Sequence, residues 1–141
     1  MAINFFEEDI AYKLPEKGIH KKWLKTLASR ENFKIKELNY IFCSDEYLHQ
    51  MNMDYLNHDT LTDIITFDNS EKDHDIEGDI FISIPRVQEN ATTQEQDFII
   101  ELRRVLAHGI LHLMGYRDKT EQEVKQMREK EDLGIQSFPQ D

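Results

Sequence analysis

The sequence predicts an α/β (α+β) fold with a single small mixed β-sheet of about four strands flanked by helices. Strand-like and helix-like hydrophobic patterns alternate in the first part of the chain, and two strand-like runs follow each other in the middle. The 141 residues contain no internal repeat, low-complexity segment or Pro/Gly/Ser-rich linker. We therefore expect one domain over residues 1–141, of the size that one hydrophobic core can support.

The first part of the chain alternates strands and helices. The expected elements are a strand in residues 3–8, a helix in 16–29, a strand in 37–44 and a helix in 45–56. The first helix is predicted because its apolar residues recur at helical spacing, with lysines on the other face. Ser44 is the expected N-cap of the second helix, because its hydroxyl can accept a hydrogen bond from a first-turn amide.

The second part begins with two strands and ends with helices. Residues 62–68 and 78–84 are rich in β-branched and aromatic residues, and the polar residues 69–77 are expected to connect them as a loop. Asp59 and Asp63 are expected to cap and turn the chain before the first of these strands.

Capping patterns mark the expected helices of the C-terminal part. Thr92 and Glu95 form a capping-box pattern that predicts a long helix from about Gln94 to Met114. Gly115 is expected to end it. Thr120 and Glu123 repeat the capping pattern and predict a last, charged helix.

The amino-acid composition excludes several classes of protein. Hydrophobic residues make up 39% and charged residues 32% of the chain, as in globular proteins that are neither fibrous nor disordered. No apolar run reaches the roughly 18 residues of a membrane span, and the N-terminus lacks the pattern of a secretory signal. The one cysteine, Cys43, lies in an apolar run and is expected to be a buried strand thiol. These features favour a cytoplasmic protein without a membrane partner.

The formal charge of −11 argues against a general nucleic-acid binder, because phosphate contacts need cations. The charge is uneven: residues 17–36 carry seven basic residues against one acid, whereas residues 63–79 carry seven acids against one lysine. Such runs are usually solvated surfaces, although a basic patch can contact RNA. The residues expected to guide an RNA backbone are Lys17, Lys21, Lys22, Lys25, Arg103 and Arg104.

The segment HGILHLMGYRD, residues 108–118, predicts a metal site. Residues four apart share one helix face, so His108 and His112 can converge on one ion. If Gly115 ends the helix, Asp118 can turn back to the same point. Two nitrogens and one oxygen leave a fourth position open for water, as in catalytic zinc sites. We expect one zinc ion per chain, with another divalent metal as an alternative.

Two other interpretations of the pair stay open. Histidines four apart in a helix are more often packed or hydrogen-bonded than metal-bound, but here their neighbours are almost all apolar, and a buried ring needs a partner. The spacing is also similar to that of metzincin proteases, which carry a glutamate general base directly after the first histidine. Gly109 occupies that position, which argues against the third hypothesis, a metal-dependent peptidase or other hydrolase.

The same segment resembles the signature HGxLHLxGYDH of the YbeY family of metalloendoribonucleases. Two upstream segments extend the resemblance: MNMDYLNHDTLTDIITF (residues 51–67) is similar to the family pattern LNxxYRxxDxxTDVLSF, and GDIFIS (78–83) to GDIxIS. The resemblance implies zinc-dependent, single-strand-specific cleavage of RNA by a metal-activated water. It implies roles in maturation of the 3′ end of small-subunit rRNA and in late ribosome quality control. The implied partners are single-stranded rRNA and ribosomal particles or ribosome-associated proteins, with an unknown oligomeric state.

The chain departs from the family pattern at two positions. Asp118 stands where the family usually has a third histidine, which keeps the ligand count but provides a harder ligand. Leu56 replaces an arginine that the family keeps near its site, so a cation that could stabilise a phosphoryl transition state is missing there. His58 and Arg117 are the candidate catalytic substitutes. The absence of arginine favours the alternative of a non-catalytic ribosome-assembly factor with a structural zinc.

Overall fold

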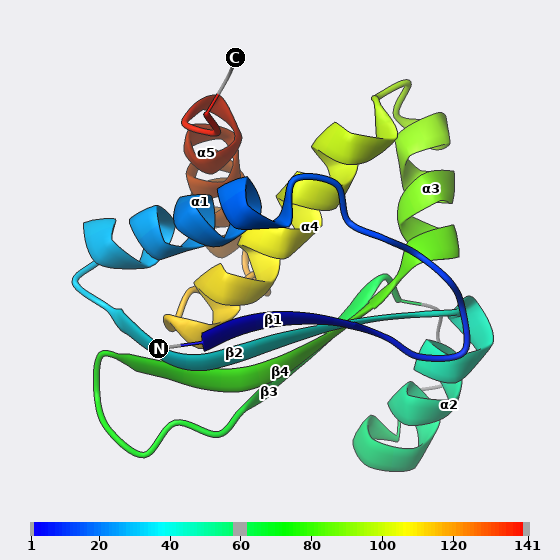
Figure 1. Ribbon diagram of the computed structural model, residues 1–141, viewed down its shortest axis with the longest axis horizontal. Coiled ribbons are helices and arrows are strands. Elements are labelled where there is room, and N and C mark those ends of the chain that lie inside the picture. The colour runs from blue at the N-terminus through cyan, green and yellow to red at the C-terminus, as the bar shows by residue number, and fades with distance from the viewer. Residues whose placement is uncertain (1, 58–61, 140–141) are drawn as a thin grey trace.

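The computed structural model describes residues 2–57 and 62–139 and has the expected α/β architecture, with one four-stranded mixed sheet (Figure 1). Its elements are β1 (Ala2–Glu7), α1 (Lys17–Arg30), β2 (Lys34–Cys43), α2 (Asp45–Leu56), β3 (Ile64–Asp68), β4 (Asp75–Ser83), α3 (Ile84–Thr93), α4 (Phe98–Leu113) and α5 (Glu121–Gln136).

The sheet has the strand order β1-β2-β4-β3. β2 pairs in parallel with both β1 and β4, and β3 runs antiparallel to β4 at one edge. β4 begins at Asp75, so the loop between the two middle strands is shorter than the expected 69–77. The antiparallel edge strand β3 is the part of the sheet that borders the functional site described below.

Helices cover the two faces of the sheet unequally. In Figure 1, α1, α3, α4 and α5 lie on one side, and α2 lies on the other. α4 is the central helix of the covered face, and its side chains Leu102, Leu106 and Ile110 are fully buried. On the opposite face, Leu48 of α2 packs with Cys43 and Ile65, which confirms the buried thiol.

Gly109 lets α4 approach the sheet closely. A Cβ atom at this position would lie 2.8 Å from Ile80 Cδ1 and 3.1 Å from Ile64 Cδ1. Real Cβ atoms do not come as close to a neighbour as 2.8 Å, so a side chain here would require Ile80 or the helix to shift. The glycine beside His108 therefore sets the distance between the helix and strands β3 and β4.

The boundary between α3 and α4 corrects one prediction. The long helix expected from about Gln94 to Met114 is α4, which begins later, at Phe98 after its N-cap Asp97. The separate helix α3 precedes it, where no helix was expected. Thr92 lies in the last turn of α3 and donates its hydroxyl to the Gln88 carbonyl. A threonine inside a helix can bond backward in this way, so the four-residue capping pattern was a false signal.

The other predicted helix ends are confirmed. Ser44 Oγ accepts from Tyr47 N at 3.1 Å and caps α2. Thr120 and Glu123 form a reciprocal capping box at the start of α5. Gly115 follows α4 with a φ of +99°, the left-handed conformation that glycine adopts without strain.

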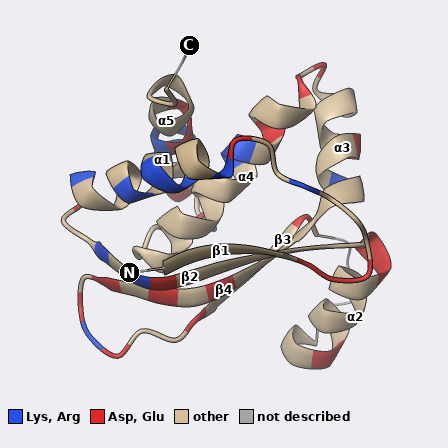
Figure 2. Ribbon diagram, in the orientation of Figure 1, with Lys and Arg blue, Asp and Glu red and all other residues tan. Residues whose placement is uncertain are grey.

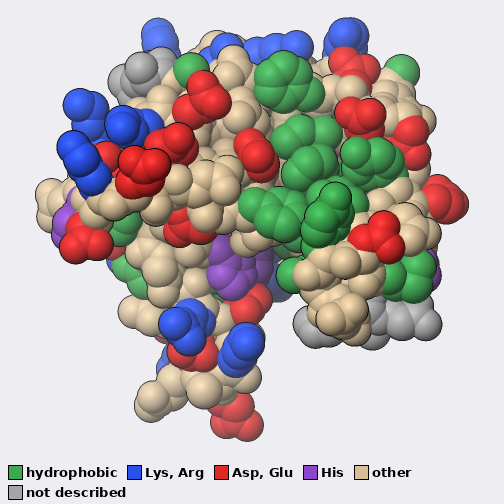
Figure 3. Space-filling model, turned by 90° about the horizontal axis from the view of Figure 1, so that it is seen from below, with side chains coloured by type: hydrophobic (Ala, Val, Ile, Leu, Met, Phe, Trp, Pro, Cys, Tyr) green, Lys and Arg blue, Asp and Glu red, His purple; other side chains and the backbone are tan. Residues whose placement is uncertain are grey.

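Charged side chains are segregated on the fold. Lys and Arg gather along α1 and the adjacent part of α4, whereas Asp and Glu are frequent on the middle strands and on α2 (Figure 2). Figure 3 shows a group of exposed hydrophobic side chains on the face seen from below. There, a groove of about 590 Å³ is lined by α2 and the two strands nearest to it, through residues that include Tyr47, Met51, Tyr55, Phe67 and Phe81. No helix in the described part of the chain is long and apolar enough to cross a membrane.

Candidate functional site

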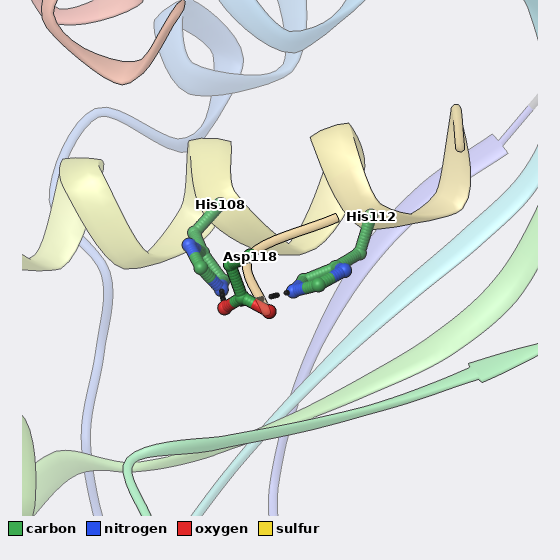
Figure 4. Close-up of side chains that lie close together, drawn as sticks. All are labelled: His108, His112 and Asp118. Carbon is green, nitrogen blue, oxygen red and sulfur yellow. Dashed lines mark ion pairs between the residues drawn. The ribbon is translucent and has the colours of Figure 1, made fainter. Parts of the chain in front are cut away.

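His108, His112 and Asp118 meet at the C-terminal end of α4, with both imidazoles directed toward the carboxylate (Figure 4). Asp118 Oδ2 lies 3.3 Å from His108 Nε2 and 3.5 Å from His112 Nε2. One ligand atom from each residue lies within 4.8 Å of the other two. The structure therefore brings together the three side chains that the sequence spacing predicts as metal ligands.

The turn after α4 returns Asp118 to the helix. Gly115 N donates to His112 O at 3.0 Å, and Tyr116 N donates to Leu111 O at 3.1 Å, so the end of the helix is closed by its own backbone. Tyr116 Oη then donates to Glu31 Oε1 at 2.7 Å and anchors the turn to the end of α1. A short, fixed connection therefore brings the carboxylate back to the helix.

Two of the three separations between the ligand atoms suit a shared divalent cation. At zinc–ligand bonds of about 2.0–2.2 Å, two ligands of a tetrahedral site lie about 3.4 Å apart. The two nitrogen–oxygen distances of 3.3 and 3.5 Å match that separation. The side chains of the two histidines are 22% and 27% exposed and that of the aspartate 38%, so solvent can reach a fourth position.

A buried carboxylate accepts a hydrogen bond from the ring nitrogen of His108 that faces away from Asp118. Glu131 Oε2, on α5, lies 2.6 Å from His108 Nδ1. Arg104 donates to Glu131 Oε1 at 3.1 Å and to Asp132 Oδ1 at 2.8 Å, which fixes the carboxylate in turn. When His108 Nδ1–H donates a hydrogen bond to Glu131, the lone pair of Nε2 is directed toward Asp118 and His112. No local pattern in the sequence marks Glu131 as a partner of His108, because the two residues lie 23 positions apart.

The pKa values of the two histidines are shifted in opposite directions. Burial disfavours the charged form of His108, but the hydrogen bond and charge of Glu131, with the charge of Asp118, outweigh it and raise its pKa. Burial and the positive charge of His108 lower the pKa of His112. His112 therefore stays a neutral ligand over a wider pH range than its neighbour.

The three residues line a cleft of about 460 Å³ between the β3 edge of the sheet and helices α3, α4 and α5. Asp63, expected to cap or turn the chain, stands in the bend directly before β3 and also lines this cleft, and burial raises the pKa of its carboxyl. Arg128, on α5, also lines the cleft and is 56% exposed. The arrangement combines a metal-ligand set, a cation and acidic groups in one solvent-filled space.

Arg117, one of the two residues considered as substitutes for the family arginine, lies beside this site. Arg117 is exposed and directly precedes Asp118 in the turn after α4. Leu56 is the last residue of α2 and is 43% exposed. His58 and Asp59 lie outside the described residues.

The basic residues predicted to contact RNA divide into two groups. Lys17, Lys21, Lys22 and Lys25 lie on α1, which packs against β2, whereas the cleft borders β3 at the opposite edge of the sheet. Arg103 faces α1, where it donates to His20 Nε2 at 3.3 Å and lies 3.6 Å from the centre of the Phe138 ring. Arg104 lines the cleft, but its guanidinium is paired with acids of α5.

Comparison with known proteins gives a consistent result. The family model described as "Endoribonuclease YbeY" matches residues 3–138. An endoribonuclease YbeY from Cytophaga hutchinsonii is 59% identical over 133 residues, which cover 94% of this chain and 93% of that protein. One from Amoebophilus asiaticus is 50% identical over 131 residues, which cover 93% of this chain and 89% of that protein. The solution structure of TM1509 from Thermotoga maritima matches with a TM-score of 0.67 and 27% identity, covering 96% of this chain and 87% of that one.

Proposed function

Because this chain belongs to the YbeY endoribonuclease family, we propose that it is a metal-dependent endoribonuclease that hydrolyses single-stranded RNA at the site formed by His108, His112 and Asp118. We propose zinc as the metal and maturation of the 3′ end of small-subunit rRNA, with late ribosome quality control, as its task. The observation that carries the proposal is the convergence of three ligand atoms within 4.8 Å in the wall of an open cleft.

The ligand set supports a catalytic role for the cation. When bound, a divalent cation here would act as a Lewis acid and lower the pKa of a coordinated water to about 7. Structural zinc sites have four protein ligands, whereas three ligands with solvent access are typical of catalytic sites. The carboxylate of Asp118 is harder than an imidazole, so manganese or iron are the alternatives to zinc.

The protein's own groups orient the site and the substrate. Glu131 fixes the tautomer and ring direction of His108 through the 2.6 Å hydrogen bond. Arg128 lies 3.9 Å from Glu131 and is mostly exposed, so its guanidinium can turn toward a phosphate oxygen in the cleft. It is a third candidate, with His58 and Arg117, for the positive charge that Leu56 does not provide.

The charge distribution favours substrate delivery by a larger particle. The net charge of −11 weakens the attraction of free RNA, and the lysines lie on α1, which packs against β2, whereas β4 separates β2 from the cleft strand β3. An extended RNA chain could contact both the cleft and these lysines only if the RNA crosses the surface of the molecule. We therefore propose that ribosomal particles or ribosome-associated proteins in the cytoplasm present the RNA, and that affinity for free RNA is low and strongly salt-dependent.

A non-catalytic ribosome-assembly factor with a structural zinc is the second candidate, and Leu56 favours it. RNA cleavage by the metal-loaded protein and by a His108→Ala variant from the same preparation separates the two functions. The endoribonuclease predicts metal-dependent cleavage that the variant loses. Absence of cleavage by the wild-type protein would favour the assembly factor, and equal cleavage by both proteins would identify a contaminating nuclease.

A further inference from the structure

The cleft extends beyond the metal ligands along α4. Glu101 lies on the same helix face as His108, two turns earlier, which places their backbones about 10 Å apart along the helix axis. The cleft is also bordered by α3 and β3, and its polar lining includes Asn90, Gln94 and Thr66.

Glu101 is unusual because it is an acidic residue at a buried position of α4. It is 5% exposed, and its Oε1 atom has no hydrogen-bond partner within residues 2–57 and 62–139. Burial raises the pKa of its carboxyl despite the nearby charge of Arg104, whose guanidinium is bonded to Glu131 and Asp132. Leaving a buried acceptor unpaired destabilises the fold, so a purely structural role would not explain an acid here.

We propose that this end of the cleft binds the base of a nucleotide adjacent to the scissile phosphate, and that Glu101 accepts a hydrogen bond from that base. This inference rests on the proposed endoribonuclease function, because the metal site defines which phosphate is cleaved. The predicted ligand is a base with an exocyclic amino group, namely adenine, cytosine or guanine, in preference to uracil.

The chemistry of the carboxyl group accounts for that preference. An ionised carboxylate offers hydrogen-bond acceptors and no donor. An amino group offers it an N–H donor, as in the pairing of Glu with cytosine N4. Uracil presents two carbonyl oxygens beside its single N–H, and these repel an acceptor. Uracil would therefore leave the Glu101 oxygen without a good partner.

The walls beside Glu101 suit a base as well. Val105 of α4, Ile64 of β3 and Met127 of α5 line the cleft with apolar surface. Single-stranded RNA is recognised by splayed bases whose faces lie on apolar or aromatic side chains and whose edges are hydrogen-bonded. The amides of Asn90 and Gln94 add donors and acceptors that can adapt to more than one base.

Mapping of cleavage sites tests the proposal. Metal-loaded wild-type protein and the variants Glu101→Gln and Glu129→Gln would each cleave a randomised single-stranded RNA, and the cut ends would be sequenced. Glu129 is an exposed residue of α5 and serves as the matched control. We expect amino-bearing bases to exceed uracil about tenfold at one position flanking the cut in the wild type and in Glu129→Gln. Gln offers a donor as well as an acceptor, so Glu101→Gln should lose most of this preference.

Two results would overturn the base site while leaving the endoribonuclease function intact: cleavage without base preference, or the same preference in Glu101→Gln. A second measurement decides the question if no protein cleaves. Metal-loaded wild-type protein would be titrated with 5′-CMP and with 5′-UMP and followed by NMR. Tighter binding of CMP would support the base site independently of cleavage, and equal binding would overturn it.

Discussion

Glu131 Oε2 lies 2.6 Å from His108 Nδ1 and thereby joins α5 to the ligand-bearing helix α4, on the side of the ring away from Asp118. The carboxylate is 4% exposed and also accepts from Arg104. A charged partner in this position makes the opposite ring nitrogen a better ligand and prevents the ring from rotating.

We therefore predict that Glu131→Gln weakens metal binding by about tenfold to a hundredfold, as is usual when the partner of a metal-bound histidine is removed. The dissociation constant would be measured by competition with a chelator. Glu129→Gln, an exposed change on the same helix, should leave the constant unchanged. Equal affinity in Glu131→Gln and wild type would show that the hydrogen bond does not orient His108.

Arg128 should contribute to phosphate binding, because its exposed guanidinium lines the cleft. We expect Arg128→Ala to lower kcat/KM for RNA cleavage by about tenfold and to reduce the salt-dependence slope of RNA binding by about 1, without changing metal content. His58→Ala and Arg117→Ala would be measured in parallel. Unchanged cleavage in any of the three variants would eliminate that residue as the source of the missing charge.

Gly109→Ala should destabilise the fold. The added methyl group would meet Ile80 and Ile64, and such overpacking costs about 1–3 kcal/mol, against which the helix propensity of alanine offsets about 1 kcal/mol. Gly134→Ala is the matched control, because its Cβ would meet Leu27 at an ordinary 3.5 Å. Urea unfolding should therefore give a lower free energy of unfolding for Gly109→Ala and an unchanged or higher one for Gly134→Ala. A stable Gly109→Ala protein would contradict the close packing of α4 on the sheet.

The raised pKa of Glu101 predicts a pH-dependent stability. The groups that act on its carboxyl are Arg104 on its own helix, Asp63 beside β3, and Arg128 and Glu131 on α5. Because the folded pKa lies above the unfolded value of about 4.3, the folded protein binds the proton more tightly. This contribution to stability is complete below the unfolded pKa and is lost as the pH rises through the folded pKa.

Glu101→Gln removes that titration. Urea unfolding from pH 4 to pH 7 should show the metal-free wild-type protein losing stability relative to Glu101→Gln as the pH rises. A constant difference in the free energy of unfolding over this range would contradict a raised pKa at Glu101.

The sequence predicted those parts of the site that local spacing encodes. His108 and His112 share a helix face at any i,i+4 spacing, and Gly115 marks the turn that returns Asp118. Glu131 comes from another helix, so the packing of α5 on α4 had to be known to find it. Glu101 was accessible to sequence reasoning, since an acid seven residues before His108 lies on the same otherwise apolar face.

The strands of the sheet were predictable from the sequence, but their order in the sheet was not. Alternating and β-branched runs identified all four strands, but strand order depends on long-range pairing that no local pattern encodes. The start of α4 was misplaced because Thr92 and Glu95 mimic a helix start, and the separate helix α3 before it was not expected. Ser83 was the better signal, since its hydroxyl accepts from Arg86 N and Pro85 stands in the first turn.

Metal analysis of the purified protein tests the central claim most directly. Wild-type protein, His112→Ala and Asp118→Ala would be purified together, and their bound zinc, manganese and iron would be quantified by mass spectrometry. We predict about one divalent ion per wild-type chain and a loss of most of it in both variants, since each removes one of three protein ligands. Stoichiometric metal retained by both variants would contradict the three-ligand site.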